Sequence, residues 1–388
     1  MAVPETPPVA GAETRGHVVI APDKFKGSLT AAEVAARVAA GLRRAGFNGE
    51  AVRVPVADGG DGTVDAAVAA GYQRVEEQVT GPAGEQVLAS FAIRGETAVV
   101  EAAAANGLAL LPRGSFAPLT ATTRGVGELI LGAVGMGARR IVLGVGGSAT
   151  TDGGAGLLQA LGARLTDASG HELPPGGAAL GRLAKLDLAT LRALRGIEFI
   201  LASDVDNPLL GPSGAAAVYG PQKGASPADV PLLDAALARW ADVAEGVTGT
   251  RYRDAPGAGA AGGLGFAALA FLGARMCPGI EYLLDLVSFG TRLHGARLVI
   301  TGEGSLDAQT LRGKTPAGVA RAVAARDPGI PVVAVAGHCT LTTQELRAAG
   351  FAAAYTLTEI EPDVARCFAD AGPLVERLGE RIAADWLG

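Results

Sequence analysis

The chain has 388 residues, a formal net charge of −6 at pH 7 and no long run of basic residues. This charge argues against nucleic acid as a partner, because proteins that bind DNA or RNA carry basic patches for the phosphates. With 49% hydrophobic residues, the chain can bury the cores of two domains. The three cysteines form no C-x-x-C pair, which argues against a zinc site.

Neither a targeting segment nor a membrane span is evident. Residues 1–16 are rich in proline and poor in large apolar residues, so we expect a disordered N-terminal tail rather than a signal peptide. The longest apolar run, residues 263–274, is too short to cross a bilayer. We therefore expect a cytoplasmic protein with no membrane partner. The sequence does not distinguish a monomer from a homodimer.

Two β-loop-α units open the chain. Residues 17–21 predict a strand, which is followed by the loop 22–28 and by a helix with a capping box at Thr30 and Glu33. The second unit has a strand over 51–56, a loop over 57–63 and a helix over 64–70. Both loops follow the carboxyl ends of their strands, where open α/β sheets bind ligands.

The pattern changes after Tyr72. Strand-like segments over 75–80, 87–93 and 98–101 are separated by short turns, which predicts an antiparallel meander. A helix is predicted over 124–136, and strands over 141–145 and 197–202. Within residues 211–226, the core 219–224 contains too many turn residues for regular structure. The helix predicted over 229–244 directs four large side chains inward, namely Leu232, Leu233, Leu237 and Trp240.

Strands alternate with helices again from residue 296 to the C-terminal helix, beginning with a strand predicted over 297–301, so the two chain ends share one pattern. We predict an α/β protein of two domains. Residues 17–72 and 293–388 form a Rossmann-like or flavodoxin-like domain with a parallel sheet, and residues 73–292 form an inserted α+β domain with a mixed sheet. Small ligands usually bind in the cleft between such domains.

The rest of the chain is organised around residues 141–156, which read IVLGVGGSATTDGGAG. A buried strand is predicted to end in a glycine-rich loop, which leads into a helix. Backbone N–H groups at such a turn can bind a phosphate, and Asp152 beside it could hold a metal ion. The turn could instead serve close packing alone. Gly144, Gly146 and Ala149 also fit the loose G-x-G-x-x-A pattern, which keeps an NAD(P)-dependent oxidoreductase acting on a small hydroxy acid as the alternative function.

Acidic residues recur where the predicted strands end. Phosphoryl transfer from a nucleotide needs carboxylates to bind Mg²⁺ and to orient the attacking hydroxyl, and cations to neutralise the phosphates. Hydride transfer would instead need a His or Tyr as acid, which no loop clearly offers. The acidic residues are Asp23, Asp58, Asp61, Asp152, Asp204, Asp206, Glu303 and Asp307, and the accompanying cations include Lys24, Lys26, Lys223 and Lys314.

The DGGDGT loop allows two interpretations, and the position of Lys314 favours one role. Asp58 and Asp61, in DGGDGT, suit a metal ion or a substrate diol, but Asp-Gly pairs also favour turns and helix caps. Lys314 directly precedes a predicted helix, where a cation opposes the helix dipole. That position favours an anion-binding role for Lys314.

The sequence resembles the bacterial type-1 class of the glycerate kinase family over nearly its whole length. The shared motifs, in chain order, are IAPDKFKGSLTA, VPVADGGDGT, VTGPAGE, GVGGSATTDGGAG, ASDVDNPL, YGPQKGA, PGAGAAGG, TGEGSLDAQT and GKTP. The resemblance implies two α/β domains with the active site between them. It also implies phosphorylation of D-glycerate by ATP and Mg²⁺ to 2- or 3-phosphoglycerate. Relatives often carry Arg where Ser305 stands here.

Within that reaction, we expect the ATP phosphates to lie on the amides of residues 146–148. The glycerate carboxylate would be bound by Lys26 or Lys314, and its hydroxyl oriented by a carboxylate of the DGGDGT loop or by Asp23. The candidate residues are, for catalysis, Asp23, Lys26, Asp58 and Asp61; for the nucleotide, Gly146, Gly147, Ser148, Thr150, Gly153 and Gly154; for the substrate, Lys26, Glu303, Asp307 and Lys314; and for Mg²⁺, Asp152 and Asp204.

Overall fold

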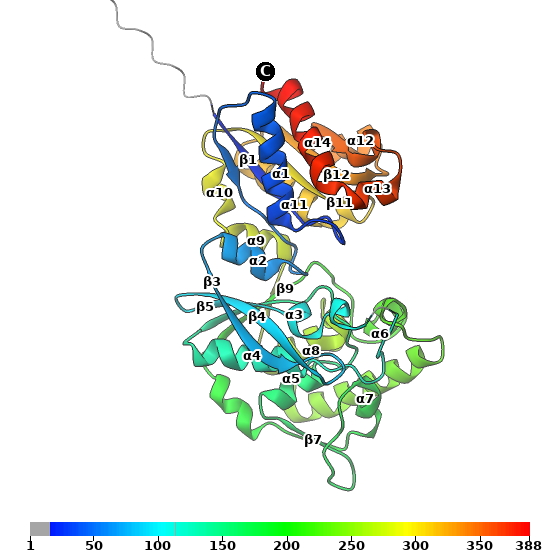
Figure 1. Cartoon of the computed structure of the whole chain (residues 1–388). Helices are drawn as coiled ribbons and strands as arrows, with labels where there is room; N and C mark the ends of the chain where they lie inside the picture. Colours follow the sequence, from blue (N-terminus) through cyan, green and yellow to red (C-terminus); the bar gives the residue numbers. More distant parts are fainter. Residues whose placement is uncertain (1–15, 113) are drawn as a thin grey trace, which may run out of the picture.

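Two β-sheets form the framework of the computed structural model, which describes residues 16–112 and 114–388. Figure 1 shows the sheet built from the first and last strands in the upper part of the molecule and the second sheet below it. The predicted tail over 1–16 lies outside the described residues, apart from Gly16. The predicted α/β class, with one parallel and one mixed sheet, is confirmed.

The first sheet has five strands, all parallel to their neighbours. Counted along the chain, the strand order is 2-1-3-4-5, which is that of flavodoxin-like sheets. The order reverses between the first and third of these strands, and ligands bind beyond the carboxyl ends of the strands at such a point. The strands, across the sheet, are β13 (Ala353–Thr356), β12 (Val332–Cys339), β11 (Ala296–Leu306), β1 (His17–Pro22) and β2 (Ala51–Arg53).

Helices cover both faces of this sheet. Alternate residues of β1 enter two cores, one shared with α1 (Ala31–Arg44) and α14 (Ala371–Trp386), the other with α9 (Gly279–Leu286) and α11 (Thr315–Arg326). A parallel strand buried on both faces is apolar throughout rather than alternating. The uninterrupted apolar residues of β1 follow from this burial.

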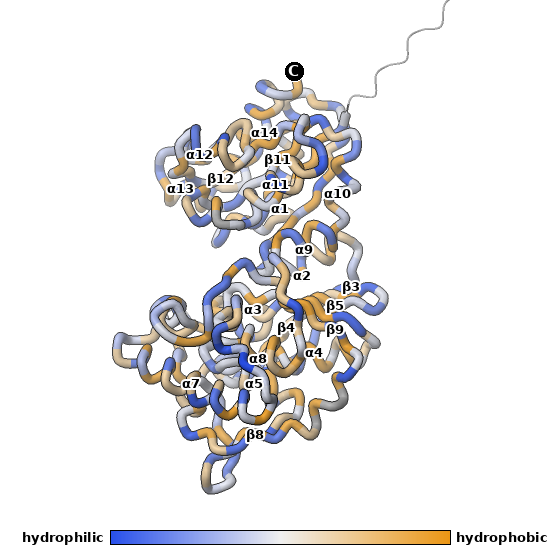
Figure 2. Tube along the Cα trace, turned by 180° about the vertical axis from the view of Figure 1, so that it is seen from behind, coloured by the Kyte–Doolittle hydropathy of each residue, from blue (hydrophilic) through white to orange (hydrophobic). Residues whose placement is uncertain are grey.

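The second sheet has six strands and is mixed. Its first three strands in the chain form the predicted antiparallel meander, and the remaining pairs are parallel. Figure 2 shows hydrophobic residues concentrated where β4, β5 and β9 lie. The strands, across the sheet, are β10 (Arg275–Cys277), β9 (Glu198–Ala202), β6 (Arg140–Gly144), β5 (Thr97–Glu101), β4 (Gln86–Arg94) and β3 (Gln73–Thr80).

One core fills the space between this sheet and its helices. Helices α4 (Arg124–Gly135), α5 (Ala155–Ala160) and α8 (Ala260–Leu272) contribute to it, and so does the fully buried Trp240 of α7 (Asp229–Thr248). The other helices and strands are short: α2 (Thr63–Ala69), α3 (Ala102–Asn106), α6 (Ala215–Tyr219), α10 (Phe289–Arg292), α12 (Thr343–Ala348), α13 (Val364–Ala369), β7 (Arg164–Thr166) and β8 (Lys185–Asp187).

Helix α2 links the two sheets. It follows β2 of the first sheet, yet Val64 and Ala67 pack with Val99 and Val142 of the second. Helix α9 does the reverse, because it lies in the inserted part of the chain but packs in a core of the first sheet. The domain boundaries at residues 72/73 and 292/293 stay a prediction.

Three local predictions were wrong. The core 219–224 contains the end of helix α6 and the 3₁₀ turn Pro221–Lys223, because Gly214 and Gly220 flank the apolar AAAV run rather than interrupt it. Leu232 of α7 is 47% exposed, since the buried stripe of that helix runs through Leu233 and Leu237. Strand β11 continues to Leu306, because residues beyond Thr301 still pair with β12.

Within the described residues, no helix has the combination of length and apolarity that spanning a bilayer requires.

Helix α4 offers a matched pair of residues for testing the larger core. Leu129 is fully buried, whereas Leu131 is 44% exposed. Leu129→Ala should lower the free energy of unfolding by about 2–5 kcal/mol because it leaves a cavity. Leu131→Ala should cost less than about 1 kcal/mol. Urea unfolding followed by circular dichroism measures both, and equal losses would contradict this packing.

Candidate active site

Two adjoining cavities lie where loops from both sheets meet. The first cavity, about 540 Å³, is lined mainly by residues that follow β1, end β11 and β12, or belong to α13. The second cavity, about 450 Å³, is lined mainly by residues 145–148, 202–205 and 219–223. The cavities form one cleft because they share five residues: Lys26, Asp58, Gly60, Gly146 and Gly147. The cleft therefore includes the switch point of the parallel sheet between β1 and β11.

Direct contact between two glycine-rich loops joins the sheets beneath this cleft. The Gly146 N–H donates to the Gly59 carbonyl oxygen at 3.1 Å. A Cβ atom on Gly146 would lie 2.6 Å from the Gly60 Cα, and one on Gly59 would lie 2.6 Å from the Ala202 carbonyl oxygen. Gly59 also has a φ of +92°, which favours glycine. Close packing and cavity lining are thus both functions of these loops.

Asp58 is at the centre of the cleft, since it lines both cavities. Its Oδ1 accepts a hydrogen bond from the Gly60 N–H at 3.1 Å. The negative charge of Asp58 also acts on carboxylates of both sheets: it contributes to raising the pKa values of Asp23, Asp204 and Glu303. These four acidic side chains therefore share one electrostatic environment.

Asp23 and Asp204 have the strongest shifts of this group. Burial, followed by the neighbouring Asp58 charge, raises the pKa of each to about 7. Asp23 Oδ2 accepts a hydrogen bond from Thr315 Oγ1 at 2.9 Å, and Asp204 Oδ1 accepts one from the Gly279 N–H at 2.9 Å. Carboxylates with raised pKa values in a cleft are typical of functional sites.

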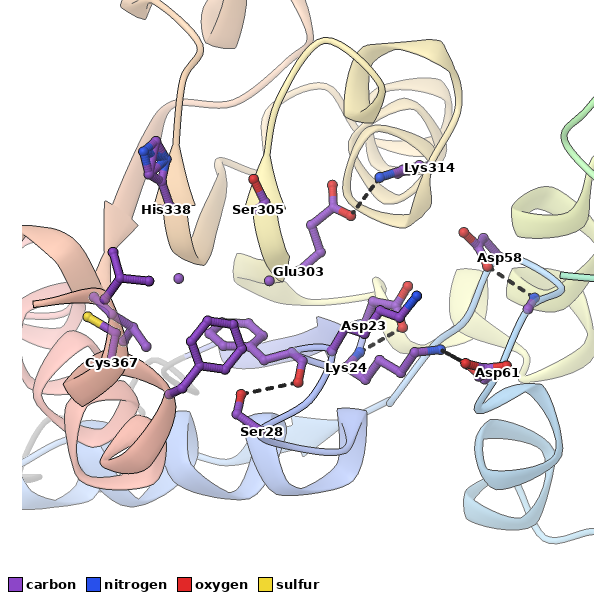
Figure 3. A pocket seen from close by; sticks show the side chains of 18 of the residues that line it. Asp23, Lys24, Ser28, Asp58, Asp61, Glu303, Ser305, Lys314, His338 and Cys367 are labelled. Carbon is purple, nitrogen blue, oxygen red and sulfur yellow. Dashed lines mark hydrogen bonds and ion pairs between the residues drawn. The ribbon is translucent and has the colours of Figure 1, made fainter. Parts of the chain in front are cut away.

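Lysines accompany these carboxylates, as Figure 3 shows. Lys24 lies 3.7 Å from an Asp61 oxygen, and Lys314 lies 3.8 Å from a Glu303 oxygen. Burial raises the pKa of Glu303. Lys26 is exposed, lines both cavities and makes no side-chain hydrogen bond or ion pair with another described residue. Lys26 is thus free to bind an anion in the cleft.

The glycine loop contributes three of its predicted residues to the cleft. Gly146 and Gly147 line both cavities, and Ser148 lines the second. Ser148 Oγ accepts a hydrogen bond at 3.0 Å from Lys223, which the sequence analysis named among the cations but did not assign to a ligand. The available signal was the motif YGPQKGA, in which Lys223 falls in a tight turn between two glycines.

Four other predicted ligand-binding residues do not line either cavity. Gly153 and Gly154 pack the loop onto the core, because a Cβ on each would lie 2.5 Å from Trp240 and 2.4 Å from Ala267. Thr150 is fully buried, and its Oγ1 accepts a hydrogen bond from Asn106. The Asp307 carboxylate caps the turn that follows β11, where it accepts N–H groups at 2.7 and 3.4 Å. In this structure these residues hold the loops in place, and their ligand contacts stay a prediction.

Asp152, which the sequence predicts as a metal ligand, also lines neither cavity. It has no exposed surface, and its Oδ2 accepts hydrogen bonds from the Thr123 N–H, the Thr123 hydroxyl and the Gly156 N–H at 2.8, 2.9 and 3.2 Å. Its Oδ1 accepts the Gly154 N–H at 3.1 Å. Asp152 therefore fixes the glycine loop to the start of α4. Among the described residues, no three acidic, His or Cys side chains are arranged to hold a metal by themselves.

Glu101 is a further residue that the sequence did not single out. It is 8% exposed, and its Oε2 accepts the N–H groups of Gly62 and Val64 at 3.0 and 3.2 Å. The end of β5 thereby holds the loop that carries Asp58. Burial raises the pKa of Glu101 to about 7.

Comparison with known proteins identifies the family of this chain. The sequence model of the Glycerate kinase family matches residues 18–387. The chain belongs to this family. It is 46% identical over 371 residues to "Glycerate kinase" of Bacillus subtilis (strain 168), covering 95% of this chain and 97% of that protein. It is 48% identical over 328 residues to "Glycerate 2-kinase" of Escherichia coli (strain K12), covering 83% and 85%.

A solved structure agrees with this assignment of the family. A crystal structure from Salmonella typhimurium LT2, provisionally named glycerate kinase 2, superposes with a TM-score of 0.81 and 41% identity. The match covers 95% of this chain and 98% of that one. The predicted resemblance to the glycerate kinase family is confirmed, and the oxidoreductase alternative is not supported.

The role of Asp152 can be tested against its neighbour. Asp152→Asn should lower the free energy of unfolding by about 1–3 kcal/mol, because an amide nitrogen would face hydrogen-bond donors. Thr151→Val is the control, since the buried Thr151 hydroxyl has no hydrogen-bond partner in the described structure. Its free energy of unfolding should change by less than about 1 kcal/mol. Urea unfolding of both variants provides the comparison; an unchanged free energy of unfolding for Asp152→Asn would contradict the anchoring role of its hydrogen bonds.

The raised pKa of Glu101 predicts that the stability of the protein depends on pH. Its pKa is about 7 when folded, above the ordinary 4.5, so between these values the folded chain holds a proton that the unfolded chain has released. The stability contributed by this proton is complete below about pH 4.5 and is lost as the pH rises through 7. Glu101→Gln stays neutral and should therefore gain stability relative to the parent protein between pH 5 and pH 8. Urea unfolding at both pH values measures this, and a constant difference would refute it.

Proposed function

We propose that this chain is an ATP-dependent kinase that phosphorylates D-glycerate, a phosphotransferase with an alcohol group as acceptor. The observation that carries the proposal is the position of Asp58, which lies between two adjoining cavities among carboxylates and lysines of both sheets. Phosphoryl transfer is catalysed mainly by positioning and by neutralisation of charge, and this cleft supplies groups for both. The names of the relatives supply glycerate as the acceptor.

The first cavity suits the nucleotide. Its far end has apolar side chains, which include Val364 and Phe368 of α13, each 55% exposed. Its near end has Lys24, Lys26 and Lys314. A nucleotide has the same two ends, an apolar base and a polyanionic tail. The base would lie against α13, and the terminal phosphate would lie near the amides of Gly146 and Gly147.

Asp58 would orient the acceptor hydroxyl. It faces both cavities, so an acceptor in the second cavity and a terminal phosphate in the first would meet beside its carboxylate. A carboxylate placed there accepts the proton of the attacking hydroxyl as the new P–O bond forms and the bond between the terminal phosphorus and the bridging oxygen breaks, releasing ADP. Lys26, which also faces both cavities, would neutralise the phosphoryl group during transfer.

The carboxylates of the cleft fit a magnesium ion whose remaining ligands come from the phosphates of the nucleotide. Mg²⁺ in kinases usually binds one or two carboxylates together with substrate phosphates, so a full protein cage is not required. Asp204 lines the second cavity, and among the described residues Arg321 lowers its pKa but forms no ion pair with it. We propose Asp204 as the protein ligand. The ion would supply neutralisation of the phosphate charge when bound.

Replacing Asp58 tests the proposal. Asp58→Asn should lower kcat for glycerate phosphorylation by about 10²–10⁴-fold, because the hydroxyl loses its proton acceptor. Coupled ADP release with D-glycerate as acceptor measures the rate, and phosphorus NMR of the product distinguishes 2- from 3-phosphoglycerate. Asp254→Asn, at an exposed aspartate outside both cavities, is the matched control.

The assay on the parent protein is decisive. Failure to release ADP with D-glycerate would refute the proposed activity, and full turnover of Asp58→Asn would remove Asp58 from the mechanism.

A further inference from the structure

Lys223 differs from the other lysines of the cleft because its side chain is buried. It ends the 3₁₀ turn Pro221–Lys223, and its exposure is 2%. Gly224 follows with a φ of +88°, and a Cβ on Gly224 would lie 2.3 Å from Phe116 Cβ. This close approach and the left-handed backbone both require glycine. The turn therefore holds Lys223 in a fixed, inward position.

The ammonium group of Lys223 is only partly satisfied by the protein. It donates to Ser148 Oγ at 3.0 Å and to the Thr150 carbonyl oxygen at 2.6 Å. An ammonium has three N–H donors, so one remains for a ligand. Among the described residues, no carboxylate forms an ion pair with Lys223.

The nearest negative charge does not take that place. Asp152 acts on Lys223 electrostatically, but the oxygens of Asp152 already accept four hydrogen bonds from its own loop and from Thr123. Burial prevails over this attraction and lowers the pKa of Lys223 to about 7. A buried cation without a counter-ion is costly, and an anionic ligand would remove that cost.

The second cavity offers a place for such an anion. Lys223 and Ser148 both line it. Ser148 Oγ accepts its hydrogen bond from Lys223, so the Ser148 hydroxyl can still donate its own proton. A carboxylate has two oxygens, each of which accepts hydrogen bonds. One oxygen can accept from Lys223 Nζ and the other from Ser148 Oγ.

We infer that Lys223 and Ser148 bind the carboxylate of the acceptor, and that they make this protein select small hydroxy acids over uncharged polyols. The inference rests on the proposed function and names the residues that recognise its acceptor. It moves Ser148 from the nucleotide phosphates, where the sequence placed it, to the hydroxy acid. Lys26 and Lys314 then remain for the nucleotide.

A carboxylate fits this position better than a nucleotide phosphate. Three other lysines line the first cavity, the one with the exposed apolar residues of α13, so the polyanionic tail has its own cations there. Lys223 lines the second cavity and not the first, and of the three other lysines only Lys26 also reaches the second cavity. Asp58 lies between the two, which puts the acceptor hydroxyl next to the transferred group when the carboxylate is held at Lys223.

Three variants test the inference. Lys223→Met removes the charge at nearly constant volume, and Lys223→Gln removes it but keeps N–H donors for the Thr150 carbonyl oxygen. Lys185→Met, at an exposed lysine of β8, is the matched control. Steady-state kinetics gives KM for D-glycerate and for ATP, and calorimetry gives the Kd of D-glycerate without turnover. Glyceramide, the uncharged amide of the same acid, serves as the comparison ligand.

For both Lys223 variants we expect KM and Kd for D-glycerate to rise at least about 30-fold, because a buried charge pair is lost. KM for ATP should change less than about 3-fold, and the preference for D-glycerate over glyceramide should collapse. Lys185→Met should behave as the parent protein. A rise in KM for ATP with unchanged D-glycerate binding would show that Lys223 binds phosphate, and would overturn the inference.

The two proposals fail in different ways. If the parent protein releases no ADP but binds D-glycerate in a manner that depends on Lys223, the kinase proposal fails and the carboxylate site stands. If turnover is normal and Lys223→Gln binds D-glycerate like the parent, the carboxylate site fails and the kinase stands. Should Lys223→Met not fold, Lys223→Gln decides alone.

Discussion

The contact of one glycine-rich loop with another is the constraint on which the rest of this structure depends. Loops 58–62 and 144–148 belong to different sheets, and their backbones meet at Gly59, Gly60 and Gly146 without side chains between them. A methyl group at Gly144 or Gly146 would force them apart. Because each loop follows the carboxyl end of a strand, their contact brings the ligand-binding edges of both sheets to one cleft.

Several charged groups in this cleft lack a counter-ion within the protein, and bound ligands would supply one. Carboxylates from both sheets surround Asp58, and several have raised pKa values because protein rather than water surrounds them. Lys223 has the opposite shift for the same reason. Groups held in this way interact more strongly with a bound phosphate, metal ion or carboxylate than they would in water. The proposed kinase activity depends on these stronger interactions with the phosphate, the metal ion and the carboxylate.

Several buried charges have a structural function instead. Asp152 and Glu101 each accept backbone N–H groups and fix the two glycine loops in place. Near a strand end, an acidic residue that accepts backbone N–H groups has the same sequence pattern as one that faces a ligand. The two kinds of acidic residue differ in whether the side chain lines the cavity or is buried below it, and this depends on how the chain packs.

The sequence by itself determined the class of fold, the capping box of α1, the meander and most strand positions, because periodicity and turn residues are local. It also determined the family and the loops that reach the cleft. Only the tertiary structure decided which residues of each loop line the cleft: Asp58 and Lys26 line both cavities, whereas Asp152 is buried and lines neither. The role of Lys223 depends equally on packing, since its buried position comes from a turn that closes against Phe116 and from a hydroxyl 75 residues away in the sequence. Such contacts between distant segments leave no periodic signal in the chain, and folding alone creates them.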